Sequence, residues 1–128
     1  MGVAAAQIIR VSASGQITTQ MTYQPIFQPW VVFGYVPLPI SLSPGTDSAY
    51  LILYGTGIRN HRANPVMATI NGVNVPVLYA SAHPTLPGLD QVDLGPLPQT
   101  FAGTGKPALN IVVVFDGIAT NTTTITIQ

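Results

Sequence analysis

The sequence predicts an all-β fold, and three observations support this. Twelve glycines and twelve prolines are spread along the 128 residues, so almost no window is long enough for a stable helix. The segments between them are rich in Val, Ile, Thr and Tyr, which suit a pleated, half-buried surface. Short strands expected about every ten residues favour a single-domain β-sandwich of about seven to nine strands.

Two strands are expected near the N-terminus, followed by a stretch of different character. Residues 7–13 are typical of a strand, Ser14-Gly15 supplies a turn, and residues 17–23 pair back onto the first strand. From residue 25 to residue 44, five prolines are interleaved with aromatic side chains. Because proline cannot donate to a sheet ladder, this stretch is predicted to be an edge strand or an ordered extended loop.

The middle of the chain contains the strongest strand signals. Residues 49–54 are apolar throughout, which predicts a central strand covered on both faces. Residues 66–70 and 73–79 are predicted to form a hairpin, because the intervening Asn71-Gly72 accepts the positive φ angles of a type I′ turn. A short strand is expected at residues 89–94, between two loops rich in Pro and Gly.

The C-terminal part predicts a second tight turn. Asp116-Gly117 follows the apolar residues 109–115 and precedes a segment in which Thr and Ile alternate up to residue 127. The alternation predicts that Ile125 and Ile127 point into the core.

Charged side chains are scarce. The formal net charge is zero, and eight residues carry a full charge: Arg10, Asp47, Arg59, Arg62, Asp90, Asp93, Lys106 and Asp116. So few, balanced charges cannot form the basic stripe that nucleic acid requires. They oppose association with a similar surface only weakly, so we expect the domain to lie against itself or a neighbouring domain. The apolar runs are too short for a membrane-spanning helix.

No residue pattern points to catalysis. The chain has no Glu and no Cys, which removes the commonest general acid and the thiol nucleophile. Residues 103–106 resemble the end of a phosphate-binding loop, but Pro107 replaces the required Ser or Thr. We therefore expect no enzyme activity, no catalytic residue and no cofactor.

Two groups of side chains have the chemistry of metal ligands without the spacing of a metal motif. They are the carboxylates Asp47, Asp90 and Asp93, and the imidazoles His61 and His83. The alternative for Asp90 is that it pairs with Arg59 or accepts hydrogen bonds from amides near residues 55–60, because a buried charge nearly always has such a partner. We favour this alternative, and we expect no metal site.

Two features suggest binding surfaces. The first is a set of aromatic side chains in or beside the Pro-rich stretch, which would stack on sugar rings if exposed or bury against a sheet if not: Trp30, Tyr23, Phe33 and Tyr35. The second is the Thr-rich terminal strand, which could exchange with a strand of a neighbouring subunit through Thr122, Thr124 and Thr126. The chain has a single Lys, so charge does little to protect an open edge.

Five segments together form a pattern that covers nearly the whole chain. They are AAAQIIRV at 4–11, YLILYGTGIR at 50–59, INGVNVPVLYA at 70–80, PGLDQV at 87–92 and DGIATNTTTITI at 116–127. This pattern resembles a paralogous family of uncharacterised C-terminal domains that is abundant in Acidobacteria and typically closes large exported proteins. From about residue 47 onward it is also similar to the immunoglobulin-like domains called IPT or TIG, which are structural and interaction modules.

The resemblance implies an immunoglobulin-like β-sandwich with a core at residues 47–128 and added N-terminal strands and the Pro-rich segment at residues 1–46. We expect a non-catalytic structural or adhesion module, outside the cell or on the bacterial surface, that associates with itself or with neighbouring domains, as in a filament or surface layer. The alternative is a carbohydrate-binding module that contacts polysaccharide through the aromatics of residues 25–44. The first 14 residues lack the basic and apolar regions of a signal peptide, so any export signal is expected outside this chain.

Overall fold

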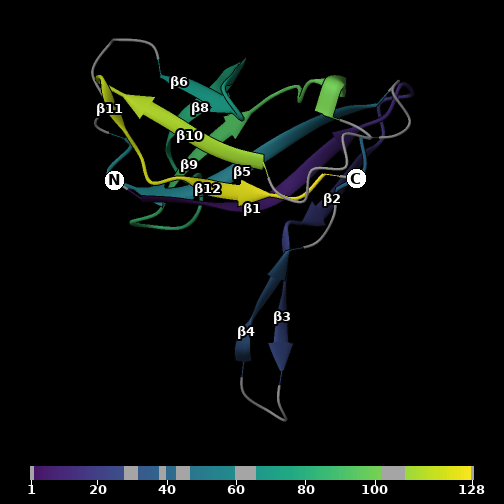
Figure 1. Ribbon diagram of the computed structural model, residues 1–128, viewed down its shortest axis with the longest axis horizontal. Helices are drawn as coiled ribbons and strands as arrows, with labels where there is room; N and C mark the ends of the chain where they lie inside the picture. The colour runs from purple at the N-terminus through teal and green to yellow at the C-terminus, as the bar shows by residue number, and fades with distance from the viewer. Residues whose placement is uncertain are drawn as a thin grey trace.

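The computed structural model describes residues 2–27, 32–37, 40–42, 47–59, 66–101 and 109–127, with the backbone alone for residues 2, 4–6, 23–27 and 32–37. In these ranges all regular structure is β-strand, apart from one 3₁₀ turn at Gln99–Phe101. All strands except β3 (Tyr23–Phe27) and β4 (Val32–Pro37) form two antiparallel sheets that pack against each other, as Figure 1 shows. The prediction of an all-β fold is confirmed, and the two sheets are consistent with a β-sandwich.

The first sheet has five strands in the order β2-β1-β5-β9-β8. Their bounds are Ile17–Met21 for β2, Gly2–Val11 for β1, Ser48–Thr56 for β5, Asp90–Leu94 for β9 and Val77–Ala82 for β8. The central strand β5 contains the predicted apolar run. Leu51 and Leu53 are fully buried in the core, and Ile52, on the opposite face, is 3% exposed. This strand is therefore covered on both faces, as predicted.

The second sheet has the order β11-β10-β6-β7, and β12 pairs with β10 as well. Their bounds are Ile118–Ala119 for β11, Leu109–Phe115 for β10, Met67–Ile70 for β6, Val73–Val75 for β7 and Thr123–Ile125 for β12. Ile125 and Ile127 are buried, so the prediction that both point into the core is confirmed. Beyond β12, Ile40 forms a parallel bridge with Ile127.

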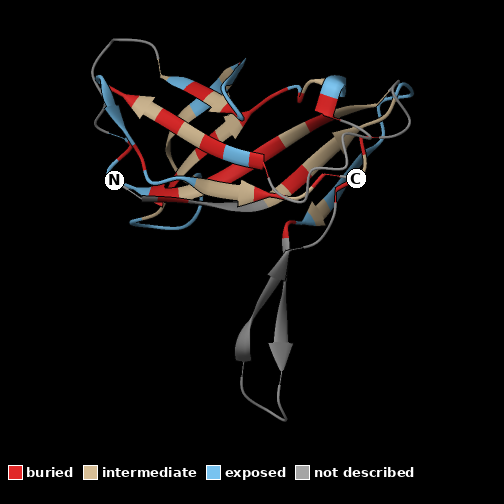
Figure 2. Ribbon diagram, viewed as in Figure 1, coloured by how far each residue is buried: buried red, intermediate tan, exposed pale blue. Residues whose placement is uncertain are grey.

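The core lies between the two sheets and takes alternate residues from the strands, as the burial colours of Figure 2 show. On β10 every second residue is buried, which is the period of a strand with one face against a core. The largest fully buried side chains come from both sheets and the segments beside them: Phe115, Ile8, Ile40, Leu42, Leu51, Leu53, Ile58, Ile70, Leu94, Leu109, Ile111 and Ile125. One shared apolar layer therefore joins the sheets.

Two tight turns have the backbone that their residues predict. Asn71 and Gly72 have φ angles of 50° and 79°, and Asp116 and Gly117 have φ angles of 51° and 79°. Positive φ at both central positions is the property of a type I′ turn, and Asn, Asp and Gly tolerate it best. Both turn predictions are confirmed.

The prediction of one strand over residues 73–79 is wrong, because this segment forms two strands in different sheets. β7 ends at Val75, and β8 begins at Val77 in the first sheet. Proline has no N–H for a sheet ladder, so the pairing of β7 ends at Pro76 and the chain crosses to the other sheet. The carbonyl of Pro76 accepts a hydrogen bond from the N–H of Gly95, at 2.9 Å.

Much of the Pro-rich stretch forms a hairpin of its own. β3 (Tyr23–Phe27) and β4 (Val32–Pro37) pair antiparallel with each other and belong to neither main sheet. Figure 1 shows this hairpin projecting from the sandwich. Within the described residues, each of the two strands has a neighbour on one side only, so both are edge strands, as the prolines predicted, although they pair with each other and not with a main sheet. With β2 the hairpin forms an insertion between β1 and β5, which is one reason why the described residues contain twelve strands and not seven to nine.

Candidate functional site

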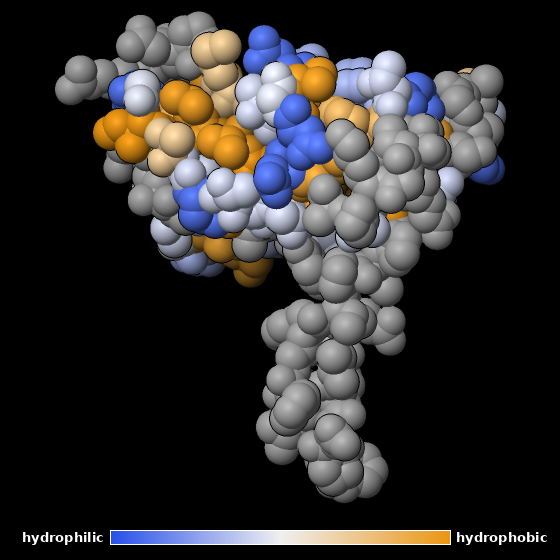
Figure 3. Space-filling model, in the orientation of Figure 1, coloured by the Kyte–Doolittle hydropathy of each residue, from blue (hydrophilic) through white to orange (hydrophobic). Residues whose placement is uncertain are grey.

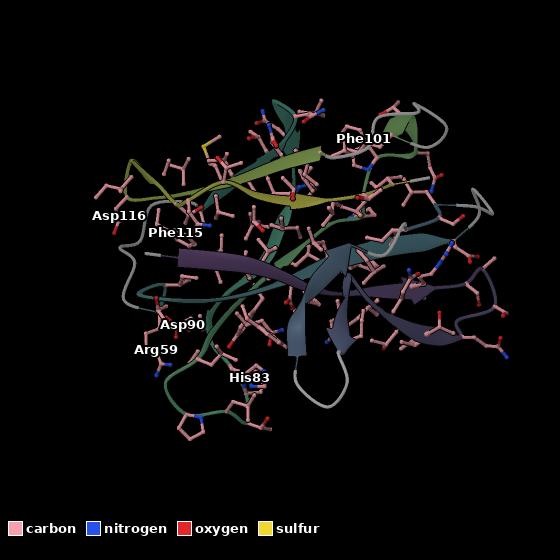
Figure 4. All side chains as sticks on the ribbon, turned by 60° about the horizontal axis from the view of Figure 1, so that its bottom comes forward. Arg59, His83, Asp90, Phe101, Phe115 and Asp116 are labelled. Atoms are coloured by element: carbon pink, nitrogen blue, oxygen red, sulfur yellow. The ribbon has the colours of Figure 1, made fainter. Side chains whose placement is uncertain are left out.

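A buried carboxylate, Asp90, joins the start of β9 to the turn after β5. Asp90 is 2% exposed. Its Oδ2 accepts hydrogen bonds from the backbone N–H groups of Ile58, at 2.7 Å, and Arg59, at 3.2 Å. Its Oδ1 accepts a hydrogen bond from Nε of Arg59, at 2.6 Å, and Figure 4 shows the two side chains next to each other. Both parts of the favoured prediction for Asp90 are confirmed: the ion pair with Arg59 and the hydrogen bonds from backbone amides near residues 55–60.

These contacts fix the ionisation state of Asp90. Burial alone would raise the pKa of the carboxyl group, because the charged form loses its water. Hydrogen bonds from the amide of Ile58 and from the side chain and amide of Arg59, together with the Arg59 charge, act in the other direction and hold the pKa of Asp90 below its ordinary value of 3.8. The group is therefore ionised at neutral pH. Because both of its oxygens accept hydrogen bonds from Ile58 and Arg59, Asp90 holds the turn after β5 against the start of β9.

The carboxylates considered as cation ligands have separate partners. On β9 the side chains of Asp90 and Asp93 lie on opposite faces, because the two residues are three positions apart in a strand. Asp93 accepts a hydrogen bond from Nε2 of Gln91, at 2.7 Å, and Asp47 lies 3.8 Å from Nη2 of Arg10. Within the described ranges, no three His, Cys, Asp or Glu side chains are placed to hold a metal ion.

His83 closes the turn that follows β8. Its Nδ1 accepts hydrogen bonds from the backbone N–H groups of Thr85, at 3.1 Å, and Leu86, at 3.0 Å. A ring nitrogen that accepts carries no proton, so the neutral ring carries its proton on Nε2. The ring also packs edge to face on Tyr54, with 5.3 Å between the centroids. His61, its predicted partner in a metal site, lies outside the described residues.

The aromatic residues predicted to stack on sugars fall mainly in the projecting hairpin. Tyr23 is on β3, and Phe33 and Tyr35 are on β4, where the structure describes the backbone alone. Trp30 lies outside the described residues, as do residues 103–106. Sugar stacking by these residues stays a prediction.

The Thr-rich edge predicted for strand exchange runs along β12. Thr124 lies opposite Asn110 of β10, and the carbonyl of Thr126 accepts a hydrogen bond from the N–H of Ile40, at 2.8 Å. Thr122 is exposed. Part of this edge is therefore engaged within the chain, and its exchange between subunits stays a prediction.

One contact that sequence reasoning missed ties the last loop to the first strand. Oδ1 of Asn121 accepts a hydrogen bond from the N–H of Val3, at 2.7 Å, and Nδ2 of Asn121 donates to the carbonyl of Val3, at 3.0 Å. The side-chain amide thus makes the pair of hydrogen bonds that a neighbouring strand would make. No local signal could reveal it, because the two residues are 118 positions apart.

Large apolar side chains are exposed on both sheets. On β2, Ile17 is 68% exposed and Met21 is 56% exposed. On the second sheet, Met67 and Ile118 are also exposed, and each lies beside β10. Figure 3 shows hydrophobic surface where β6, β10 and β11 meet. The sequence predicts strands with one face toward the solvent, but it does not predict which large apolar side chains are exposed on that face.

Comparisons of the chain with protein-family models, with curated proteins and with solved structures found no match in any of the three. A helix able to cross a bilayer does not occur in the part of the chain that the structure describes.

Proposed function

We propose that this chain is a non-catalytic structural or adhesion module that associates with itself or with neighbouring domains. A surface with few charges and with exposed apolar side chains carries this proposal. Its setting, outside the cell or on the bacterial surface as part of a filament or surface layer, follows from the sequence resemblance to domains of exported proteins.

Most charges of the described residues are engaged within the fold. Arg59 binds Asp90, Arg10 lies against Asp47, and Asp93 accepts a hydrogen bond from a neighbouring amide. Hydroxyl, amide and apolar groups therefore make up most of the outer surface. Two such surfaces can meet without like-charge repulsion and without the cost of desolvating an ion.

Exposed apolar side chains supply a reason for contact. Ile17, Met67 and Ile118 are each more than half exposed, and they lie on strands and not on loop tips. Burial of apolar area stabilises association by about 25 cal/mol per Å² before entropic costs. The hydrophobic surface where β6, β10 and β11 meet (Figure 3) is of the kind that commonly marks an interaction site.

The order of the strands supports an immunoglobulin-like fold of the IPT/TIG type. The order β1-β5-β9-β8 corresponds to the A-B-E-D sheet of immunoglobulin domains, and β12-β10-β6-β7 corresponds to G-F-C with an added C′ strand. On this correspondence β2, β3 and β4 are an insertion between strands A and B. Immunoglobulin-like folds are common in cell-surface proteins, which agrees with an interaction role.

The mass of the protein in solution tests this function. Light scattering coupled to size exclusion, over a concentration series, is expected to show a mass that rises above the monomer as concentration increases. Negative-stain images of the heaviest fraction would then separate closed oligomers from filaments. A monomer at every concentration, together with no binding to neighbouring domains of a longer parent chain, would contradict the proposal.

A carbohydrate-binding role is the second candidate, and the projecting hairpin favours it. β3 and β4 pair with no strand of the main sheets, and the sequence from residue 23 to residue 37 includes Trp30, Phe33 and Tyr35. Exposed aromatic faces stack on sugar rings. On this reading Trp30→Ala abolishes retention on insoluble cellulose or chitin with an unchanged melting temperature, whereas Tyr79→Ala on β8 retains binding. A parent protein that is not retained by any polysaccharide would remove this candidate.

A further inference from the structure

Sheet edges present unpaired backbone groups, and folded proteins protect them with short strands, bulges, prolines or charges. The two main sheets have four edges in the described residues, and three have such a feature. β7 has three residues and is followed by Pro76. The opposite edge of the second sheet is divided into β11 and β12, with two and three residues. β8 has a register shift against β9 between Val77 and Tyr79, which marks a bulge.

The fourth edge, β2, has none of these features. It pairs with β1 over five residues without a register shift, from Gln7 opposite Met21 to Val11 opposite Ile17. Its sequence, Ile-Thr-Thr-Gln-Met, contains no Pro, no Gly and no charge. Among the described strands, β1 alone pairs with it. In the part of the chain that the structure describes, β2 is therefore an open, uncharged edge with exposed apolar side chains at both ends.

The charged side chain on the strand next to β2 already has a partner. Arg10 of β1 lies opposite Thr18 and is within 3.8 Å of Asp47. Natural edges commonly carry an outward Lys or an inward charge that would be buried by an added strand. No such charge stands on β2, so an added strand meets no electrostatic barrier there.

The sequence of β2 is also complementary to itself. Gln20 lies opposite the buried Ile8, so Thr18 and Gln20 face the core side, and Ile17, Thr19 and Met21 face outward. In an antiparallel pair with a two-fold axis through Thr19, each Ile17 lies opposite Met21 of the second copy, and Thr19 lies opposite Thr19. Apolar pairs and Thr–Thr pairs are among those that stabilise antiparallel strands.

We propose that two copies of this chain pair through β2, antiparallel, with Thr19 at the two-fold axis. The first sheets of the two copies then form one continuous sheet from β8 of one copy to β8 of the other. This inference rests on the proposed self-association. It specifies that the partner is a second copy of the chain and that the two copies meet at the edge strand β2. Because the strand is short and uncharged, the dimer is expected to be weak and to depend little on salt.

The register makes a charge at position 19 diagnostic. Thr19 is exposed, so Thr19→Lys and Thr19→Glu leave the monomer folded. In the dimer, each substitution places two like charges directly opposite each other, which is expected to raise the dimer Kd by roughly fivefold or more. An equimolar mixture of the two variants places Lys opposite Glu and is expected to restore association. Thr56→Lys is the matched control, because Thr56 is an exposed Thr at the end of β5 that lies opposite Gly2 and not on β2.

Sedimentation velocity of the parent, the three variants and the mixture tests the proposal, with circular dichroism to verify folding. The proposal predicts a dimer for the parent, for Thr56→Lys and for the mixture, and monomers for each Thr19 variant alone. Equal association of the parent and Thr19→Lys would overturn pairing through β2 and leave the proposed function standing. Failure of the mixture to recover would also overturn the two-fold register. A parent that stays monomeric would overturn both the pairing and self-association.

Discussion

Replacing Asp90 with Ala should destabilise this chain far more than replacing its ion-pair partner Arg59 with Ala. Asp90→Ala leaves the amide of Ile58, a fully buried residue, without its acceptor at 2.7 Å. An orphaned buried donor costs about 1 to 3 kcal/mol, and the lost ion pair adds about 1 kcal/mol or less because the Arg59 side chain is 38% exposed. The expected total is about 1 to 4 kcal/mol. Arg59→Ala keeps both amide donors on Asp90 and should cost about 1 kcal/mol.

The effect of Asp90 on stability should depend on pH with a definite sign. The folded pKa of Asp90 lies below its ordinary value of 3.8. The contribution of the carboxylate is therefore fully present above about pH 4 and is lost as the pH falls through the folded pKa. The difference in the free energy of unfolding between the parent and Asp90→Ala should be constant near neutral pH. It should become smaller in strong acid, because the parent then loses the stabilisation by the ionised carboxylate, which the variant lacks at every pH.

Urea unfolding followed by circular dichroism measures both quantities. The free energies of unfolding of the parent, Asp90→Ala and Arg59→Ala are compared at about pH 7, and the first two again below about pH 3. The reasoning would be refuted by an Asp90→Ala cost below about 0.5 kcal/mol at neutral pH. A gap that widened in acid would refute the sign.

Three further substitutions test other parts of the fold by thermal unfolding. Gly95→Ala should cost about 2 to 4 kcal/mol, because Gly95 has a φ of 142° and a Cβ would stand 2.7 Å from Cδ1 of Tyr50. The control Gly117→Ala, at a φ of 79° and with nothing within 4 Å of the added Cβ, should cost only about 1 kcal/mol. Equal costs for the two substitutions would contradict the clash with Tyr50. Thr22→Val should be neutral or stabilise by about 1 kcal/mol, since the buried Oγ1 has no hydrogen-bond partner, and a clear loss of stability would show that the hydroxyl is used. Asn121→Ala should lower stability by about 1 to 2 kcal/mol through loss of its two hydrogen bonds to β1, and an unchanged melting temperature would argue against this tie.

Features set by neighbouring residues in the chain could be predicted from the sequence. The turns at Asn71-Gly72 and Asp116-Gly117 are examples, because their positive φ angles depend on the two turn residues themselves. The pairing of Asp90 with Arg59 could also be predicted, since a chain with so few charges must satisfy a buried carboxylate from a short list of partners.

Features set by tertiary pairing could not be predicted. β1 begins at Gly2 and not at residue 7, because residues 2–5, which have little strand propensity, pair with β5. The break at Pro76 needed knowledge of which sheet each half of the segment joins. Whether another strand pairs with the outer edge of β2 depends on how the inserted strands β2, β3 and β4 are arranged in space. No local sequence pattern predicts that arrangement.

Hydrogen exchange at low and high protein concentration is the most direct test of the association account. Pairing through β2 predicts that the amides of Ile17, Thr19 and Met21 become more protected as concentration rises, because alternate N–H groups of β2 face its open edge and a second strand accepts their hydrogen bonds. Amides of β8 and β12 should exchange at the same rate at both concentrations. Exchange that is independent of concentration along the whole chain would contradict self-association, and protection confined to Thr123–Ile125 would place the interface on β12 and not on β2.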